Sequence, residues 1–252
     1  MPLLGDAKHE DLVAFLSGVV GMLGDPAAIL VISAHWECDQ PTLTGRDDPD
    51  LIYDYYGFPQ ESYEIKYPAP GHTQLANEVL ALMRDEGIQA ILDYRRGFDH
   101  GLFVPLKLMY PEAKIPCVQL SLLRNLDPAK HINLGKSIAA LRKKGVLIIG
   151  SGMSFHNIKY FFDFKAESRR EDDEFNHWLI ETCADQGMTP DEREKRLVEW
   201  ESAPCSRFCH PREEHLLPLH VCYGAACFES PKAEVVFNQE VMGRKVVSFL
   251  WQ

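Results

Sequence analysis

The sequence lacks the features of several protein classes. It has no apolar run approaching the roughly 18 residues of a membrane helix. Its first twenty residues carry Asp6, Glu10 and Asp11 without the basic segment that opens a signal peptide. Basic residues are scarce, with 26 Lys and Arg against 37 Asp and Glu, so the net charge is −11. We therefore expect a cytoplasmic protein whose partners include neither nucleic acid nor a membrane surface.

The cysteine pattern excludes a disulfide framework. The seven cysteines are odd in number and scattered, which favours reduced thiols. Cys205 and Cys209 have the spacing of half a zinc site, but no second Cys or His pair at finger spacing accompanies them. The sequence also lacks repeats, low-complexity stretches and linkers. We therefore interpret residues 1–252 as a single domain with a well-buried core.

The hydrophobic pattern predicts the fold class. Short runs rich in Ile, Val and Leu predict buried strands over 28–33, 89–94, 115–121 and 146–150. Helical patterns cover 10–22, 72–85, 102–110, 131–144, 171–185, 190–200 and 213–227. Two alternating segments, 233–237 and 245–251, predict an antiparallel pair around Met242-Gly243. The expected fold is α/β: a single domain with a mostly parallel central sheet flanked by helices and a C-terminal antiparallel strand pair.

Residues 38–71 form a long connection with little helix or strand signal. The segment is crowded with aromatic residues, namely Tyr53, Tyr55, Tyr56, Phe58, Tyr63 and Tyr67. Loops of this length are usually functional or disordered, and so many aromatic residues argue against disorder. Two compatible interpretations stay open: a loop packed over the sheet edge, and a wall or lid over an aromatic substrate.

Four histidines lie where an apolar segment ends in a loop: His35, His100, His156 and His215. Imidazole is the commonest protein metal ligand. In open α/β sheets, ligands bind outside the carboxyl ends of the strands, where residues from successive segments can converge. We therefore predict a mononuclear metal site in which His35, His156 and His215 approach a common point, with His100 on the rim.

The other histidines have simpler interpretations. We expect His131 and His177 at the surface, and His220 in the core or supporting the site. His210 precedes Pro211, so it either caps the following helix or lines the pocket.

Five segments together resemble a known family. They are SAHWE (33–37), YDYYGFPQESYEIKYPAPG (53–71), GFDHGLFVPLKLMYP (97–111), SGMSFHN (151–157) and HPREEHLLPLHVCYGAA (210–226). In combination they resemble the class III extradiol ring-cleavage dioxygenases, the LigB superfamily, and especially its DOPA-dioxygenase-type branch. The resemblance implies a non-haem metal, Fe(II), with Zn(II) as an alternative in the isolated protein, and insertion of O₂ into a catechol-type ring with extradiol cleavage.

The resemblance also implies the metal ligands. His35 would be one ligand, and His215, or Glu214 beside it, would supply another. His156 would lie at the metal, either as a ligand or as an acid/base. Imidazole and carboxylate ligands on one face leave open positions on Fe(II), as in non-haem oxygenases generally.

Further residues would face the substrate, a small aromatic diol. His100 would contact the diol or oxygen, and Tyr56 and His210 are expected in the substrate pocket. His156 and His100 are the catalytic candidates, because the second hydroxyl proton of a catechol needs a base of near-neutral pKa. The expected role is in the catabolism of aromatic compounds, and homo-oligomer formation is left open.

The start of the chain departs from the family pattern. Members usually begin with a strand ending in His-Gly-Gly-Gly-Pro or similar, whose His is another metal ligand. This chain opens with Met1-Pro2-Leu3-Leu4-Gly5-Asp6, which resembles the residues after that motif. We therefore expect an N-terminally incomplete domain with part of its sheet exposed. His9, in a polar segment expected at the surface, is not expected to replace the ligand.

Two alternatives to the oxygenase remain. A zinc hydrolase could use the same ligands to activate water. A non-catalytic binding protein similar to the Memo family is the other. The aromatic loop favours the oxygenase, because a flat apolar substrate forms ring contacts.

Overall fold

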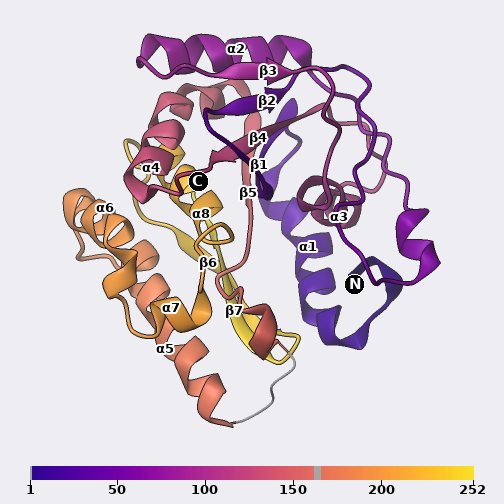
Figure 1. The fold of residues 1–252 in the computed structure, drawn as a ribbon. Coiled ribbons are helices and arrows are strands. Elements are labelled where there is room, and N and C mark those ends of the chain that lie inside the picture. Colours follow the sequence, from indigo (N-terminus) through magenta and orange to yellow (C-terminus); the bar gives the residue numbers. More distant parts are fainter. Residues whose placement is uncertain (1, 162–165) are drawn as a thin grey trace.

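The computed structural model describes residues 2–161 and 166–252, and it has a five-stranded sheet with helices on both faces (Figure 1). The strand order is β3-β2-β4-β1-β5. The strands are β1 (Ala28–Cys38), β2 (Thr42–Thr44), β3 (Ile91–Asp93), β4 (Cys117–Leu123) and β5 (Val146–Ser151). All pairings are parallel except that of β2 with β4. The predicted α/β class with a mostly parallel sheet is confirmed.

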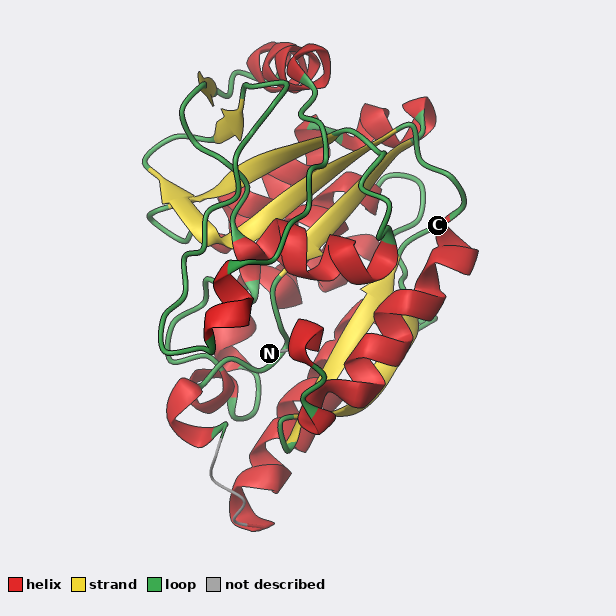
Figure 2. Cartoon of the chain, turned by 90° about the vertical axis from the view of Figure 1, so that its right-hand side faces the viewer, coloured by secondary structure: helices red, strands yellow, loops and turns green. Residues whose placement is uncertain are grey.

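The central strand β1 is buried on both faces because its side chains alternate between two cores. Leu30 and Ile32 pack in the core formed with α2 (Thr73–Asp85), α4 (Pro128–Ser137) and α8 (Leu217–Ala226). Ile29 and Val31 pack in the opposite core with α1 (Glu10–Leu23) and α3 (His100–Met109). Figure 2 shows these two helical layers on either side of the sheet. No described helix is long and apolar enough to cross a membrane.

The carboxyl-terminal part forms a second, smaller layer. The antiparallel hairpin of β6 (Glu234–Val241) and β7 (Arg244–Leu250) confirms the predicted closing pair. It packs with α5 (Ala166–Ala184) and α7 (Ser206–Cys209) around a third apolar cluster, and α6 (Pro190–Val198) packs against α5. Phe15 of α1 contacts Phe237 of β6, with ring centroids 4.9 Å apart, and so joins this layer to the main domain.

Several boundaries differ from the sequence prediction. β1 continues past Ser33 to Cys38 through a shift in register, and the short strand β2 lies inside the connection predicted to have little structure. The helical segment 131–144 divides into α4 and a 3-10 helix, Ala139–Lys144. The late helix begins at Leu217 rather than at 213, because 211–216 form turns.

Two histidine predictions are wrong. His131 is buried in the core, where its Nε2 accepts the Leu123 backbone N–H at 3.0 Å and its Nδ1 lies 2.7 Å from the Asp127 carbonyl. His9 is buried rather than exposed and pairs with Asp6 at 3.2 Å. Polar neighbours in the sequence suggested a surface position for both histidines. A buried imidazole, however, needs only local backbone or side-chain partners.

The sheet has an open edge at β5. Residues 2–9 form two 3-10 helices, so no strand precedes α1 in the described chain. The side of β5 that faces away from β1 has no strand partner among the described residues.

Candidate metal centre

The four predicted histidines meet at the carboxyl ends of β1 and β5. The ring centroids of His35 and His215 are 4.8 Å apart, and those of His156 and His215 are 3.3 Å apart. His100 lies on the other side of His35, with the two centroids 3.8 Å apart. The structure thus brings the four predicted histidines together, with His35 between His100 and His215.

A bulge in β1 and the start of α3 set the positions of His35 and His100. The register of β1 against β4 shifts between Ser33 and Glu37, and such bulges re-aim side chains. Ser33 Oγ accepts the His35 backbone N–H at 3.2 Å and donates to the fully buried Asp99 at 2.8 Å. Asp99 in turn caps α3 by accepting the Gly101 N–H at 3.0 Å. The strand and the helix are therefore fixed to each other directly behind the two imidazoles.

His35, His100 and Asp54 form the first group of candidate ligands, with donor atoms all within 4.8 Å of one another. Asp54 Oδ1 lies 2.7 Å from His100 Nδ1. Burial acts to raise the pKa of Asp54, but the hydrogen bond and charge of His100 lower it overall. The sequence analysis did not identify Asp54. The available signal was an acidic residue placed inside a run of tyrosines.

His156, Glu214 and His215 form the second group. Glu214 Oε1 lies 3.1 Å from His156 Nδ1 and 3.0 Å from His215 Nδ1. Burial opposes ionisation of Glu214, but the hydrogen bonds from the two histidines hold its pKa well below the usual range. Each imidazole that uses Nδ1 for a carboxylate keeps Nε2 for a ligand.

Burial controls the protonation of two of these imidazoles. It lowers the pKa of His35 to about 3, assisted by the neighbouring His100, and it lowers the pKa of His215 to about 3. Both rings are therefore neutral at physiological pH and carry a lone pair for a metal.

An ion pair that the sequence analysis missed lies at the rim. Arg212 donates to both carboxylate oxygens of Glu37, at 2.5 and 2.7 Å, and its Nη1 lies 3.4 Å from Glu214 Oε2. This two-pronged contact joins the end of β1 to the segment that carries Glu214.

The aromatic connection packs beside His100. Tyr55 lies edge-on to His100 with centroids 5.5 Å apart, and it also contacts Tyr53 and Tyr63. The Tyr55 hydroxyl donates to the Ser62 carbonyl, which fixes the ring. The segment thus packs against the protein and also walls the site. The predicted substrate contact Tyr56 is 92% exposed, so Tyr55, whose ring contacts His100, replaces it as the candidate.

His210 lies behind the site rather than in it. Its ring is completely buried between Phe175 and Trp200, and Nε2 pairs with the Ser154 carbonyl at 3.0 Å. No surface is left for a substrate, so the expected pocket position is corrected to a packing role. His220 is a core residue, with its ring nitrogens on the Leu197 and Leu216 carbonyls.

Comparisons with known proteins agree with this geometry. Residues 17–247 match the family described as the catalytic LigB subunit of aromatic ring-opening dioxygenase. The chain is 38% identical over 266 residues to dioxygenase tasH of Hapsidospora irregularis, covering 100% of this chain and 82% of that protein. It is 44% identical over 215 residues to the 4,5-DOPA dioxygenase extradiol of Beta vulgaris, covering 84% and 78%.

A solved structure has the same fold. An uncharacterized protein from Escherichia coli K12 superposes with a TM-score of 0.77 at 28% identity, covering 94% of this chain and 91% of that one. The family match and the curated relatives confirm the resemblance found in the motifs and favour the oxygenase over the hydrolase and the binding protein. The chain belongs to the LigB family of aromatic ring-opening dioxygenases, in the class III extradiol, DOPA-dioxygenase-type branch.

Proposed function

We propose that this enzyme uses Fe(II) to cleave the ring of a small catechol by extradiol addition of O₂. The observation that carries the proposal is that the group His156, Glu214 and His215 lies directly beside His35 at the carboxyl ends of the strands, with the His35 and His215 ring centroids 4.8 Å apart. The family match extends over all four residues, which supports one catalytic domain.

The side chains present suit a non-haem metal. Neutral imidazoles and an ionised carboxylate are the ligands that Fe(II) takes in oxygenases, and Zn(II) accepts the same set. We assign His35 and His215 as imidazole ligands, with Glu214 and His156 completing or supporting the set. When bound, Fe(II) would supply open positions for both catechol oxygens and for O₂.

The protein's own residues then handle the proton and the ring. His100 is oriented by Asp54 through Nδ1, so its other nitrogen is available to take the proton of the second hydroxyl. The ring of Tyr55, beside His100, offers a surface against which the ring of the catechol can pack. His156 is the second catalytic candidate. Its Nδ1 pairs with Glu214, and its ring stacks on that of His215.

The relatives suggest the substrate class. Several are named 4,5-DOPA dioxygenase extradiol, in Beta vulgaris, Portulaca grandiflora and Mirabilis jalapa. We propose that this enzyme also acts on a 3,4-dihydroxyphenyl compound with an acidic side chain, in aromatic catabolism.

The net charge of −11 disfavours a polyanionic partner. The free cysteines suit a reducing compartment, and we place the enzyme in the cytoplasm.

One experiment tests the metal and the reaction together. The protein is loaded anaerobically with Fe(II) or Zn(II), its metal content is measured, and oxygen uptake is followed with DOPA, catechol and hydroquinone. We expect uptake with the iron form and the ortho-diols, accompanied by the absorbance of a ring-opened product. Hydroquinone is the matched control, because its two oxygens cannot reach one metal. Ester hydrolysis by the zinc form without oxygen uptake by the iron form would overturn the proposal.

A further inference from the structure

Glu214 and His215 lie in a segment without regular secondary structure. Residues 211–216 form turns before α8, so two candidate ligands are held by contacts rather than by a helix or strand. The His215 carbonyl accepts the Met153 N–H at 3.0 Å, and a Cβ added at Gly152 would lie 2.1 Å from the same oxygen. These contacts hold the backbone at His215. The carboxylate of Glu214 needs a different contact to orient it.

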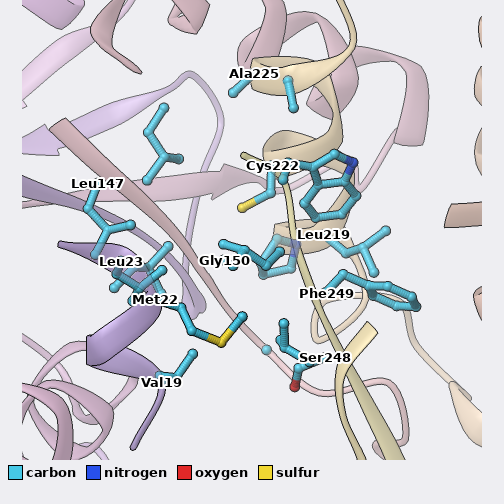
Figure 3. A pocket seen from close by; sticks show the side chains of 18 of the residues that line it. Val19, Met22, Leu23, Leu147, Gly150, Leu219, Cys222, Ala225, Ser248 and Phe249 are labelled. Carbon is cyan, nitrogen blue, oxygen red and sulfur yellow. The ribbon is translucent and has the colours of Figure 1, made fainter. Parts of the chain in front are cut away.

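An apolar cavity borders one side of this segment. Its volume is about 480 Å³, and His215 and Leu216 form part of its lining. Figure 3 shows Leu219 of α8 and Phe249 of β7 among the side chains that line the same cavity. Hydrocarbon side chains fill space but donate no hydrogen bond to a carboxylate. The group that orients Glu214 must therefore approach from another direction.

Two arginines contact the adjacent glutamates of the segment. Arg207 of α7 donates to Glu213 at 2.6 Å. Arg212 donates to both oxygens of Glu37 at the end of β1, and its Nη1 lies 3.4 Å from Glu214 Oε2. Arg212 therefore bridges a carboxylate of the strand and a carboxylate of the metal centre. Because the two glutamates have different arginine partners, the two contacts can be removed one at a time.

We propose that Arg212 is a positioning residue of the metal centre, which acts through Glu37 and Glu214. The guanidinium is planar, so its two contacts with Glu37 fix the direction in which Nη1 reaches Glu214. With Oε2 held from the rim, Oε1 of the same carboxylate faces His156 and His215. Arg212 thus orients the acidic group of the centre without contacting either imidazole.

The same bridge ties together the two segments that supply the imidazole ligands. Glu37 lies two residues after His35, where the pairing of β1 with β4 resumes after the bulge. Arg212 lies three residues before His215, and the His35 and His215 ring centroids are 4.8 Å apart. Ligands on separate segments keep their spacing only while those segments stay in register. This inference rests on the proposed function, because it assumes that these side chains bind the metal.

The test measures Fe(II) affinity and the stability of the metal-free protein separately. Native protein, Arg212→Gln and the matched control Arg207→Gln are titrated anaerobically with Fe(II) against a chromophoric chelator, and the Tm of each metal-free protein is recorded. We expect the Fe(II) Kd to rise about 10- to 100-fold in Arg212→Gln and less than about twofold in Arg207→Gln. The two arginine side chains are 50% and 43% exposed, so the falls in Tm should be small and similar. Weakening of iron binding in both variants in proportion to Tm would overturn the proposal.

Further variants test whether Arg212 acts through Glu37. Glu37→Gln should weaken iron binding as Arg212→Gln does, and the double variant should bind no more weakly than the weaker single variant, because all three lack the same bridge. Arg212→Lys keeps the charge but not the two-pronged geometry, so its Fe(II) Kd should stay within about threefold of that of Arg212→Gln. Additive losses in the double variant, or native affinity in Arg212→Lys, would contradict the bridge.

Kinetics separate positioning from direct recognition of the substrate. With iron in excess, Arg212→Gln should lower kcat equally for DOPA and for 4-methylcatechol, which has no carboxylate, and should change each KM less than about threefold. A rise in KM confined to DOPA would make Arg212 a substrate-binding residue, and the inference would be wrong. If the native protein bound no iron, the proposed function would fail together with this inference. If native protein and Arg212→Gln bound iron equally, only this inference would fail.

Discussion

At the scale of single residues, carboxylates organise the site by holding imidazoles. Asp54 pairs with His100, while one oxygen of Glu214 faces both His156 and His215. A hydrogen bond to Nδ1 fixes which ring nitrogen carries the proton and leaves Nε2 for a ligand or substrate. The roles of neighbouring histidines are therefore set by different carboxylates and can be separated by mutation.

His215→Ala should abolish stoichiometric iron binding, whereas His100→Ala should retain iron and lower kcat about 100-fold. A ligand is needed before substrate arrives, while a base acts only on bound substrate. Metal analysis of the purified variants and oxygen uptake with DOPA measure the two effects. Equal loss of iron in both variants would contradict this division of roles.

Asp54→Asn should lower kcat about 10- to 100-fold with iron content unchanged. The amide keeps the size of the side chain but removes the charge that favours a protonated His100 during turnover. Asp48→Asn is the control, because the Asp48 side chain is 90% exposed beside Arg46. If the loss appeared in KM or in iron content instead, Asp54 would be a binding residue.

The histidines could be predicted from the sequence, but their partners could not. His35, His100, His156 and His215 each follow an apolar segment, and the sheet topology carries such positions to one edge. Asp54 reaches His100 across 46 positions, and Arg212 reaches Glu37 across 175. No local pattern encodes such approaches, because they depend on how the long connection and the turns before α8 cross the sheet.

At the scale of elements, helix α8 both presents the site and packs closely on α4. Glu214 and His215 directly precede it. Further along, a Cβ added at Gly224 would lie 2.1 Å from the Ile132 carbonyl oxygen, and one added at Gly135 would lie 2.0 Å from the Val221 carbonyl oxygen. The two helices approach so closely that only glycine fits at these positions.

Gly224→Ala should lower the free energy of unfolding by about 1–3 kcal/mol, because α8 must move away from α4. Since α8 follows His215, iron affinity should fall as well. Urea unfolding and iron titration measure these changes.

The control for this helix prediction is Gly21→Ala. A Cβ at Gly21 of α1 meets no atom within 4 Å, so the substitution should be neutral or stabilise the helix by up to about 1 kcal/mol. A Gly224→Ala variant as stable as the native protein would show that α4 and α8 separate at no cost.

Element boundaries were predictable where a long periodic pattern exists and not elsewhere. The 14 residues of α1 repeat often enough to define a helix, whereas the three residues of β2 do not define a strand. The continuation of β1 to Cys38 was missed because the bulge at His35 interrupts the strand pattern. The hydrogen bonds of Ser33 and Asp99, rather than local strand propensity, stabilise that bulge.

At the scale of the whole molecule, strand order is the main feature that hydrophobicity does not encode. The run of β5 predicted a buried strand, and its position at the open edge follows from the topology alone. The fold class was predictable, because alternating strands and helices leave few arrangements. The burial of His131 was not, and it has a consequence for stability.

The metal-free protein should lose stability as the pH falls from about 6.5 towards 4. Burial lowers the pKa of His131 from 6.5 to about 4, and Nε2 of the neutral ring accepts the Leu123 N–H. The unfolded chain then binds more protons than the folded one in this window, so the contribution is complete above 6.5 and disappears at low pH. For His131 alone it amounts to about 3 kcal/mol.

Urea midpoints of His131→Gln and the native protein at pH 7.0 and 5.0 measure this effect. The glutamine variant, whose amide oxygen can still accept the Leu123 N–H, should show a smaller fall between the two pH values. His177→Gln should match the native protein, since the His177 side chain is 74% exposed. An unchanged pH response in His131→Gln would remove His131 from the explanation.

The wide spacing of the site along the chain also affects biosynthesis. The candidate ligands extend from His35 at the start of the sheet to His215 just before α8. A nascent chain exposes His35, Asp54 and His100 on the ribosome long before Glu214 and His215 emerge. The complete centre therefore cannot guide the folding of the first half. The full set of candidate ligands is available only after Glu214 and His215 have emerged, and metal binding to the finished fold would then add to stability by mass action.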